Sequence, residues 1–162
     1  DMATLKDLMV RVRASSTLPF VMPAVHIDGH VYYDGGLGQG AGIPLQLALD
    51  SGCSRIFAIL TRPKGFRKPA PDIGRSARMI ANSYHKYPYV REALLTRNER
   101  YNAELEKLEQ LAAEGKAYIV YADKMAVENN TTDIKKLRSS YFDGYNQAQK
   151  EFPCWLEWLG IE

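Results

Sequence analysis

Residues 24–36 read AVHIDGHVYYDGG, and the expected architecture is built outward from them. Two short runs of β-forming residues flank the pair Asp28-Gly29, and an Asp-Gly pair in that position favours a two-residue type I′ turn. The second run, His30 to Tyr33, ends at Asp34. We therefore expect a β-hairpin whose second strand leads directly to a carboxylate.

A run of glycines follows this carboxylate, at positions 35, 36, 38, 40 and 42. Glycine allows positive φ angles and lets other groups approach the backbone closely. Ile43-Pro44 then opens an expected helix, because proline is tolerated in the first turn. That helix should stop at Ser51-Gly52.

The flanking segments alternate between helices and strands. A first helix should carry Leu5, Leu8, Met9 and Val12 on one face. Arg55 to Leu60 (RIFAIL) is a short apolar run after a helix, which predicts a buried parallel strand. Ala117 to Tyr121 predicts another strand.

Three further helices are expected in the second half of the chain. One should run to about Ser83, and one long helix should extend from near Pro88 to Gly115. The last should carry an apolar stripe and be interrupted at Pro153; the stripe consists of Ile134, Leu137, Tyr141, Tyr145 and Ala148. This order predicts an α/β layer fold with a partly parallel sheet, treated as one domain over 1–162.

Composition excludes several classes of protein. The chain has 162 residues, of which 46% are hydrophobic and 25% charged, with a net charge of +2. This is typical of an ordinary globular protein and gives no reason to expect a nucleic-acid partner. The two cysteines, Cys53 and Cys154, match no metal or redox spacing. No apolar stretch is long enough to span a membrane, and no signal peptide is evident.

The chain begins with Asp1 and enters a helix almost at once, and its strands are few for its helices. We therefore expect that it starts inside a longer protein and that further strands lie upstream.

Asp34 is the first candidate for chemistry. A carboxylate at the end of a strand, followed by glycines and a helix, lies where α/β folds place ligands. Such a group can act as a general base toward a serine hydroxyl or can orient a histidine. The alternative is that Asp34 merely begins a tight glycine turn.

Nucleotide binding by the glycine run is a second hypothesis. Residues 36–41 approximate the dinucleotide-binding fingerprint. However, the preceding strand is a hairpin arm, and the following strand ends at Thr61-Arg62 without an acid for a ribose. No Gly-Lys-Ser/Thr is present, which excludes a P-loop.

Two other patterns favour ordinary structure. Gly74-Arg75-Ser76-Ala77-Arg78 approximates a nucleophile elbow, but Arg78 replaces the last glycine, so Ser76 is interpreted as a helix residue. His26, Asp28 and His30 alternate around the hairpin turn without a nearby cysteine, and His85 is isolated, so no metal site is expected.

A basic segment over 62–78 could contact an anion such as a phosphate. Its cations are opposed only by Asp72, and the first three, Arg62, Lys64 and Arg67, are the candidate contacts; the others are Lys68, Arg75 and Arg78. A solvated loop is the alternative, and the segment lacks the interleaved aromatics of a single-strand binder.

At this point the sequence resembles the patatin-like phospholipase family. The resemblance runs through Ala14–Pro19, Pro23–Gly36 and Ile43-Pro44 to Gly52. Leu60–Arg67 and Tyr141–Tyr145 are similar to a bacterial branch of that family, so nearly the whole chain is covered. Gly42 is a departure, because many relatives place a small polar residue before Ile-Pro.

The resemblance implies the C-terminal part of a three-layer patatin-like (lysophospholipase-type) α/β fold. It implies a Ser–Asp dyad in which Asp34 is the base, with Gly35 and Gly36 letting the nucleophile elbow pack against it. The serine, in a Gly-x-Ser-x-Gly, and the oxyanion donors would lie upstream. The activity implied is hydrolysis of a lipid carboxylic ester, with no metal or organic cofactor.

Several expectations follow. This chain alone should be inactive, and its apolar surface should favour self-association. The expected partner is a lipid or other ester substrate, with a cytoplasmic location and peripheral membrane contact. The rival hypothesis is a non-enzymatic anion- or nucleotide-binding module that uses the glycine loop 35–42 and the basic loop 62–78.

Overall fold

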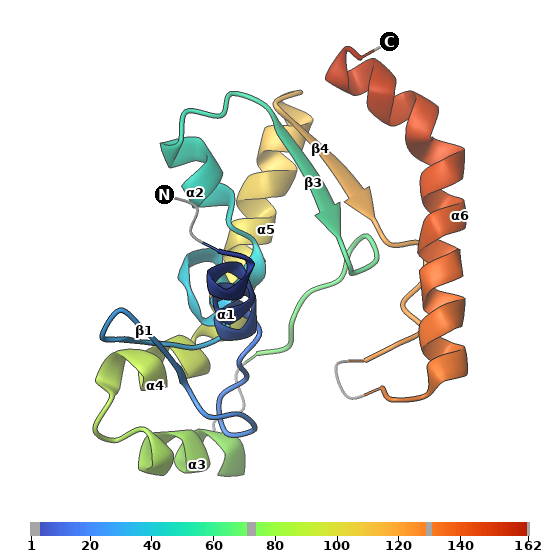
Figure 1. The fold of residues 1–162 in the computed structure, drawn as a ribbon. Helices are drawn as coiled ribbons and strands as arrows, with labels where there is room; N and C mark the ends of the chain where they lie inside the picture. The colour runs from blue at the N-terminus through green and yellow to red at the C-terminus, as the bar shows by residue number, and fades with distance from the viewer. Residues whose placement is uncertain (1–3, 71–73, 129–130, 162) are drawn as a thin grey trace. The chain divides into compact units, whose positions relative to one another are not determined.

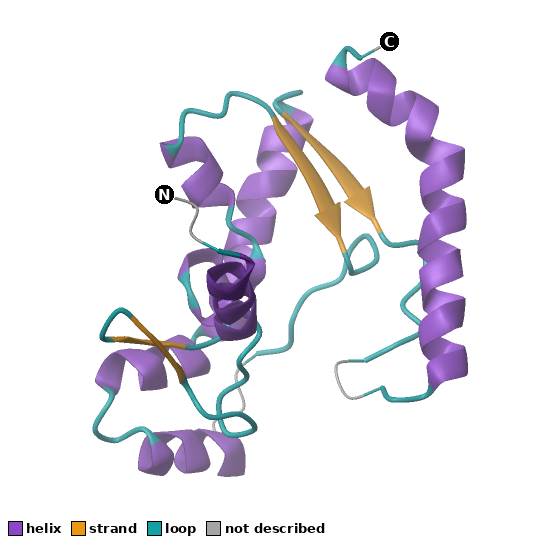
Figure 2. Cartoon of the chain, in the orientation of Figure 1, coloured by secondary structure: helices purple, strands orange, loops and turns teal. Residues whose placement is uncertain are grey.

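A computed structural model gives the structure of the chain, and it describes residues 4–70, 74–128 and 131–161. The chain divides into two compact units, each with its own two-stranded sheet (Figures 1 and 2). The first unit is Asp1–Gly52 with Lys68–Lys107, and the second is Cys53–Arg67 with Leu108–Glu162. Both contain helices and strands, so the expected mixed α/β class is confirmed.

The first unit opens with helix α1 (Leu5–Ser15) and a β-hairpin. Thr4 and Asp7 form a reciprocal capping box at the start of α1, and the hydrogen bond from the Thr4 side chain holds the pKa of Asp7 below its usual value. Strands β1 (Val25–Ile27) and β2 (His30–Tyr32) pair antiparallel, with Ile27 opposite His30. Asp28 and Gly29 have φ angles of 50° and 79°, which confirms the predicted type I′ turn.

The rest of the first unit is short helices. Two 3₁₀ turns, η1 (Gly35–Leu37) and η2 (Gln39–Gly42), lead into α2 (Leu45–Asp50), which is capped by Ser51 as expected. Helices α3 (Arg75–Ser83) and α4 (Pro88–Leu95) precede α5 (Arg97–Ala113), whose residues from Leu108 belong to the second unit. The buried side chains include Tyr84, Tyr101 and Leu105.

The prediction of a single helix from Pro88 to Gly115 is wrong, because the helix is interrupted at Thr96, which separates α4 from α5. Arg100 Nη2 donates to Ala93 O at 2.8 Å, and the Thr96 hydroxyl donates to Glu92 O at 2.9 Å. Side chains thus occupy carbonyls at the end of α4, and the β-branched Thr96 sits where the direction changes. The periodicity of apolar residues does not detect such a change, since it continues across the break.

The second unit contains a parallel strand pair and one long helix. Strand β3 (Ile56–Leu60) pairs in parallel with β4 (Ala117–Tyr121), with Ile56 opposite Ala117, as the sequence predicts. Most of β3 is only half-buried and Ile59 is 66% exposed, so the expectation of a buried strand is wrong for the described residues. The pair has no further described strand beside it to complete a sheet.

Helix α6 (Ile134–Leu159) continues through Pro153, so the expected interruption there is wrong. An interior proline removes one backbone hydrogen bond and crowds the carbonyl four residues earlier, but ring contacts hold the turns beyond Pro153. Trp155 and Trp158 lie 5.7 Å and 6.0 Å from the ring of Phe57, and Trp158 lies 5.7 Å from that of Tyr118. Tertiary packing therefore overrides the local cost of the proline.

Several apolar faces predicted from periodicity exist but are exposed. Leu5, Leu8, Met9 and Val12 of α1 are each at least half exposed, as are Ile134, Tyr141 and Tyr145 of α6. Cys53 and Cys154 are exposed free thiols. These exposed apolar side chains are the basis of the predicted self-association, which stays a prediction.

Candidate functional site

Asp34 lies two residues beyond β2 and caps the first 3₁₀ turn. Its Oδ1 accepts a hydrogen bond from Gly36 N at 2.7 Å. Its own backbone N–H donates to Thr17 O at 2.9 Å. Thr17 is fully buried, and its hydroxyl donates to Arg13 O. The segment Ala14–Pro19 and the Asp-Gly-Gly segment, which carry the family resemblance, therefore contact each other directly.

The Asp34 carboxylate has one oxygen in use and one available. Among the described residues, none donates a hydrogen bond to Oδ2, and the residue as a whole is half-buried. A carboxylate oriented through one oxygen keeps the other free to accept a proton. Oδ2 is therefore available to accept a proton or a hydrogen bond from another group.

Gly36 is held tightly between two charged side chains. A Cβ atom at this position would lie 2.7 Å from Arg97 Nη2 and 2.8 Å from Asp34 Oδ1. Arg97 and Asp34 make no ion pair within the described residues, and Arg97 Nε is buried with no hydrogen-bond partner there. The Arg97 guanidinium therefore packs against the glycine backbone, which only glycine permits.

Arg100 fixes the carbonyl groups of the same loop. Its guanidinium donates to Leu37 O at 3.2 Å and makes a second, short hydrogen bond to Gly38 O. Because charge-assisted hydrogen bonds are among the stronger ones, Arg100 should restrict the loop that follows Asp34.

Glu104 supports the loop farther on. It is only 5% exposed, and its Oε1 accepts from Gln46 N at 3.2 Å at the start of α2. Its Oε2 pairs with Lys107 at 3.2 Å. Gly40, with φ of 78°, leaves the space that Glu104 Cγ occupies, since a Cβ there would lie 3.3 Å from it.

Arg97, Arg100 and Glu104 were not candidates from the sequence. Their spacing of three and then four residues places them on one side of a helix. That spacing is the one local signal available, and it is equally typical of a solvated charged face. Their actual partners lie more than 50 positions away in the chain, which periodicity does not reveal.

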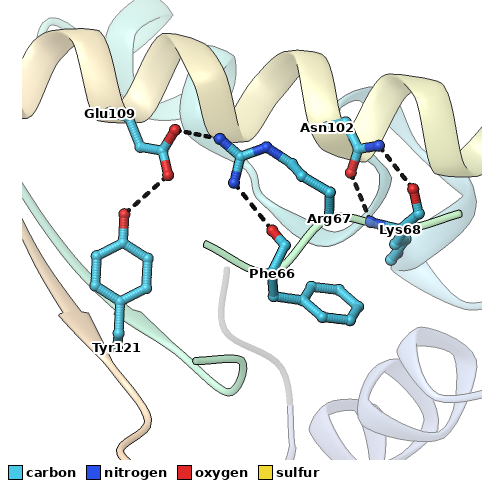
Figure 3. Close-up of polar contacts among 6 residues, drawn as sticks. All are labelled: Phe66, Arg67, Lys68, Asn102, Glu109 and Tyr121. Atoms are coloured by element: carbon cyan, nitrogen blue, oxygen red, sulfur yellow. Dashed lines mark hydrogen bonds and ion pairs between the residues drawn. The ribbon is translucent and has the colours of Figure 1, made fainter. Parts of the chain in front are cut away.

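The predicted basic contacts belong to the second unit and are largely engaged by other groups. Arg62 Nη1 lies 2.7 Å from Met125 Sδ, and the guanidinium stacks 4.8 Å above the ring of Phe66. Arg67 pairs with Glu109, and its other terminal nitrogen donates to Phe66 O at 2.9 Å (Figure 3). Lys64 is exposed. Arg62 and Arg67 are therefore less available to an external anion than their charges imply.

The remaining basic residues lie in the first unit. The backbone of Lys68 exchanges two hydrogen bonds, both of 2.9 Å, with the amide of Asn102 (Figure 3). Its ammonium lies 3.9 Å from the ring centroid of Tyr101. Arg75 and Arg78 are exposed on α3. Asp72, the expected opposing acid, lies outside the described residues.

The other patterns are placed as follows. His26 and His30 lie on β1 and β2 and are exposed, and His85 Nδ1 contacts Asn82 O at 2.9 Å. Over the described ranges, no group of three or more His, Cys, Asp or Glu side chains could hold a metal ion. Ser76 lies within α3, which confirms its interpretation as a helix residue. None of the helices in the part of the chain that is described is long and apolar enough to cross a membrane.

A similarity to a known family is found in the second half of the chain. A domain of unknown function (DUF6363) matches residues 87–160, which include α4, α5, β4 and α6 and leave out the Asp34 loop. No curated protein and no solved structure matches the chain significantly.

Proposed function

We propose that the chain is the C-terminal part of a patatin-like serine acyl hydrolase with a three-layer α/β fold, in which Asp34 is the base of a Ser–Asp dyad. The observation that carries the proposal is the Asp34 carboxylate, oriented through Oδ1 by Gly36 N and open at Oδ2. Gly36 adds support, because its missing side chain lets its N–H approach the Asp34 carboxylate while the Arg97 guanidinium packs beside it.

In this proposal a serine hydroxyl supplied upstream of Asp34 attacks the carbonyl carbon of a lipid ester. Asp34 Oδ2 accepts the hydroxyl proton as the C–O bond forms, and the proton then passes to the leaving alcohol. Water next attacks the acyl carbonyl, with Asp34 again accepting a proton, and this proton passes to the serine oxygen as the C–O bond breaks and the fatty acid is released. The hydrogen bond from Gly36 N would keep Oδ2 directed toward the serine throughout.

The loop contacts give this base a fixed position. Arg100 anchors the carbonyls of Leu37 and Gly38, and the Thr17 carbonyl anchors the Asp34 amide. A base held this way gains from preorganisation, since small displacements of a reacting group reduce rates steeply.

The test is Asp34→Asn in the natural polypeptide that contains this chain. Asparagine keeps an acceptor oxygen for Gly36 N but does not take up a proton. We expect p-nitrophenyl ester turnover to fall about 10²- to 10⁴-fold, the usual contribution of a general base. Labelling by a serine-reactive fluorophosphonate should fall in parallel.

Asp28→Asn is the matched control. Asp28 lies in the neighbouring hairpin turn, its side chain is 83% exposed, and asparagine suits its φ of 50°. Full activity in Asp34→Asn, or an equal loss in both variants, would exclude the dyad assignment. Ester turnover by the 162-residue chain alone that disappears on Asp34→Ala would mean that a serine within this chain is the nucleophile.

A further inference from the structure

The second unit contains a cleft between α6 and the strand pair. It lies at the carboxyl ends of the parallel strands β3 and β4, the position at which open α/β sheets bind ligands. Its volume is about 690 Å³, within the range of small-molecule sites. Its walls are mainly apolar and include Ile59, Leu60, Val120, Met125, Val127 and Trp155.

The cleft is elongated along the helix. Its lining on α6 extends from Ser140 to Trp155, which corresponds to about 22 Å at the usual helical rise. Gly144 lies one helical turn from the Ser140 end, and nothing stands within 4 Å of the position where its Cβ would be. An apolar lining of this length suits an extended hydrocarbon chain.

One wall carries an unsatisfied hydrogen-bond donor. Trp155 Nε1 is buried, and among the described residues it has no hydrogen-bond partner. A buried donor left without an acceptor costs about 1–3 kcal/mol. Because protein atoms cover this nitrogen even with the cleft empty, Trp155 contributes other atoms of its side chain, and not its N–H, to the cleft wall.

Charged side chains of both signs line the same cleft. Lys124 and Lys150 supply two cations, and Asp123 and Asp143 supply two carboxylates. None of the four forms an ion pair with another described side chain. Gln147, by contrast, is fully engaged with the backbone of Tyr121 and Asp123 and with Glu151. The cleft therefore presents free charges of both signs around an apolar interior.

We propose that this cleft binds a single-chain amphiphile with a zwitterionic head group. The hydrocarbon chain occupies the apolar walls beside Gly144. The lysine ammonium groups contact the anionic part of the head, and the two carboxylates contact its cationic part. This site belongs to the second unit and does not depend on Asp34 or on ester hydrolysis.

The experiment titrates the chain with four dodecyl amphiphiles below their aggregation concentrations and follows binding by calorimetry. Dodecylphosphocholine is zwitterionic, dodecyl sulfate anionic, dodecyltrimethylammonium cationic and dodecyl maltoside uncharged. We expect the zwitterion to bind at one site with an affinity at least about fivefold above the other three, the range of one or two weak charge contacts.

Variants locate the site. Gly144→Leu should lower the affinity for dodecylphosphocholine about tenfold or more, because the new side chain fills the cleft. The matched control is Gln149→Leu, which adds the same side chain to the exposed opposite side of α6, outside the cleft. Thermal unfolding of both variants checks that α6 remains folded.

Substitutions of the charged residues in the cleft test the contacts to the head group separately. Lys150→Gln should shift preference toward the cationic amphiphile, and Asp143→Asn should shift it toward the anionic one.

The proposal is overturned by the absence of saturable binding, by equal affinity for all four amphiphiles, or by an equal effect of Gly144→Leu and Gln149→Leu. Each outcome is separable from the hydrolase proposal, because Asp34→Asn should leave this binding unchanged. Dodecylphosphocholine binding that persists in Asp34→Asn supports the cleft proposal, whatever the ester turnover, and does not bear on the hydrolase proposal.

Discussion

The Asp34 loop and the α6 cleft use charged side chains in opposite ways. Around the loop, Arg100 and Glu104 are bonded to the backbone of residues more than 50 positions away in sequence. Around the cleft, Lys124, Lys150, Asp123 and Asp143 surround open space without an ion pair among the described residues. In the first region charge holds the backbone in place, and in the second it remains available to a ligand.

This difference separates charged side chains that are engaged within the fold from charged side chains that form no ion pair among the described residues. Arg62 and Arg67 belong with the first kind, since Phe66, Met125 and Glu109 already engage them. A cluster of cations in a sequence therefore says little about anion binding until their partners are known. Substitutions in the two regions should accordingly differ in their effect on folding.

The largest expected effect is at Glu104. Replacing it with alanine leaves Gln46 N without its acceptor and removes a buried carboxylate, so we expect a loss of about 2–4 kcal/mol in the free energy of unfolding. Urea unfolding followed by circular dichroism measures it.

The controls come from both regions. Lys107→Ala, whose side chain is 61% exposed, should cost less than about 1 kcal/mol. Asp143→Ala in the cleft should stay within about 0.5 kcal/mol, as is usual away from a paired or packed group. Equal losses of unfolding free energy in Glu104→Ala and Asp143→Ala would contradict the difference between the two regions.

A pair of glycine substitutions tests the two regions next. Gly36→Ala should destabilise by about 1–3 kcal/mol, because its Cβ would overlap Arg97 Nη2 and Asp34 Oδ1. Gly144→Ala should stabilise by up to about 1 kcal/mol, because alanine favours the helix and the cleft has room. Urea midpoints give both values. A stabilising Gly36→Ala would show that Arg97 moves away freely.

The smallest effect concerns alkaline pH. Burial, followed by hydrogen bonding and repulsion from Tyr84, raises the pKa of Tyr33 in the first unit above its usual value of 10.0. Burial, followed by repulsion from Cys154 and Glu151, raises that of Tyr118 in the second. Because each folded-state pKa is raised, the associated stability is complete below about pH 10 and is lost as pH rises through the folded value.

Tyr33→Phe and Tyr118→Phe should therefore each reduce the fall in stability between about pH 9 and about pH 11. Thermal unfolding at stepped pH measures the slope, and the wild-type chain provides the reference. A slope unchanged in both variants would mean that neither hydroxyl contributes to the alkaline loss.

Local sequence signals predicted the local structure well. The hairpin at Asp28-Gly29, the end of α2 at Ser51 and the parallel strands all follow from turn chemistry and short apolar runs. The break at Thr96 and the continuity through Pro153 were missed. Both depend on contacts that periodicity does not contain, namely the Arg100 guanidinium on Ala93 O and the ring packing of Trp155 and Trp158.

The candidate sites differ in the same way, because some depend on local sequence and others on tertiary contacts. Asp34 and its glycines were identifiable because strand, acid and glycines are neighbours in sequence. Arg97, Arg100 and Glu104 reach the loop only through the tertiary fold. The cleft was not identified at all, since its lining comes from 59–61, 120–127 and 140–155, which no single pattern joins.

The two exposed cysteines allow a distance within the second unit to be measured. Cys53 precedes β3, and Cys154 lies on α6 one residue before Trp155. No other cysteine occurs in the chain, so a pair of spin labels can be attached without mutagenesis. The distance distribution between the labels would then report how far α6 stands from the strand pair, and it should narrow when a molecule fills the cleft.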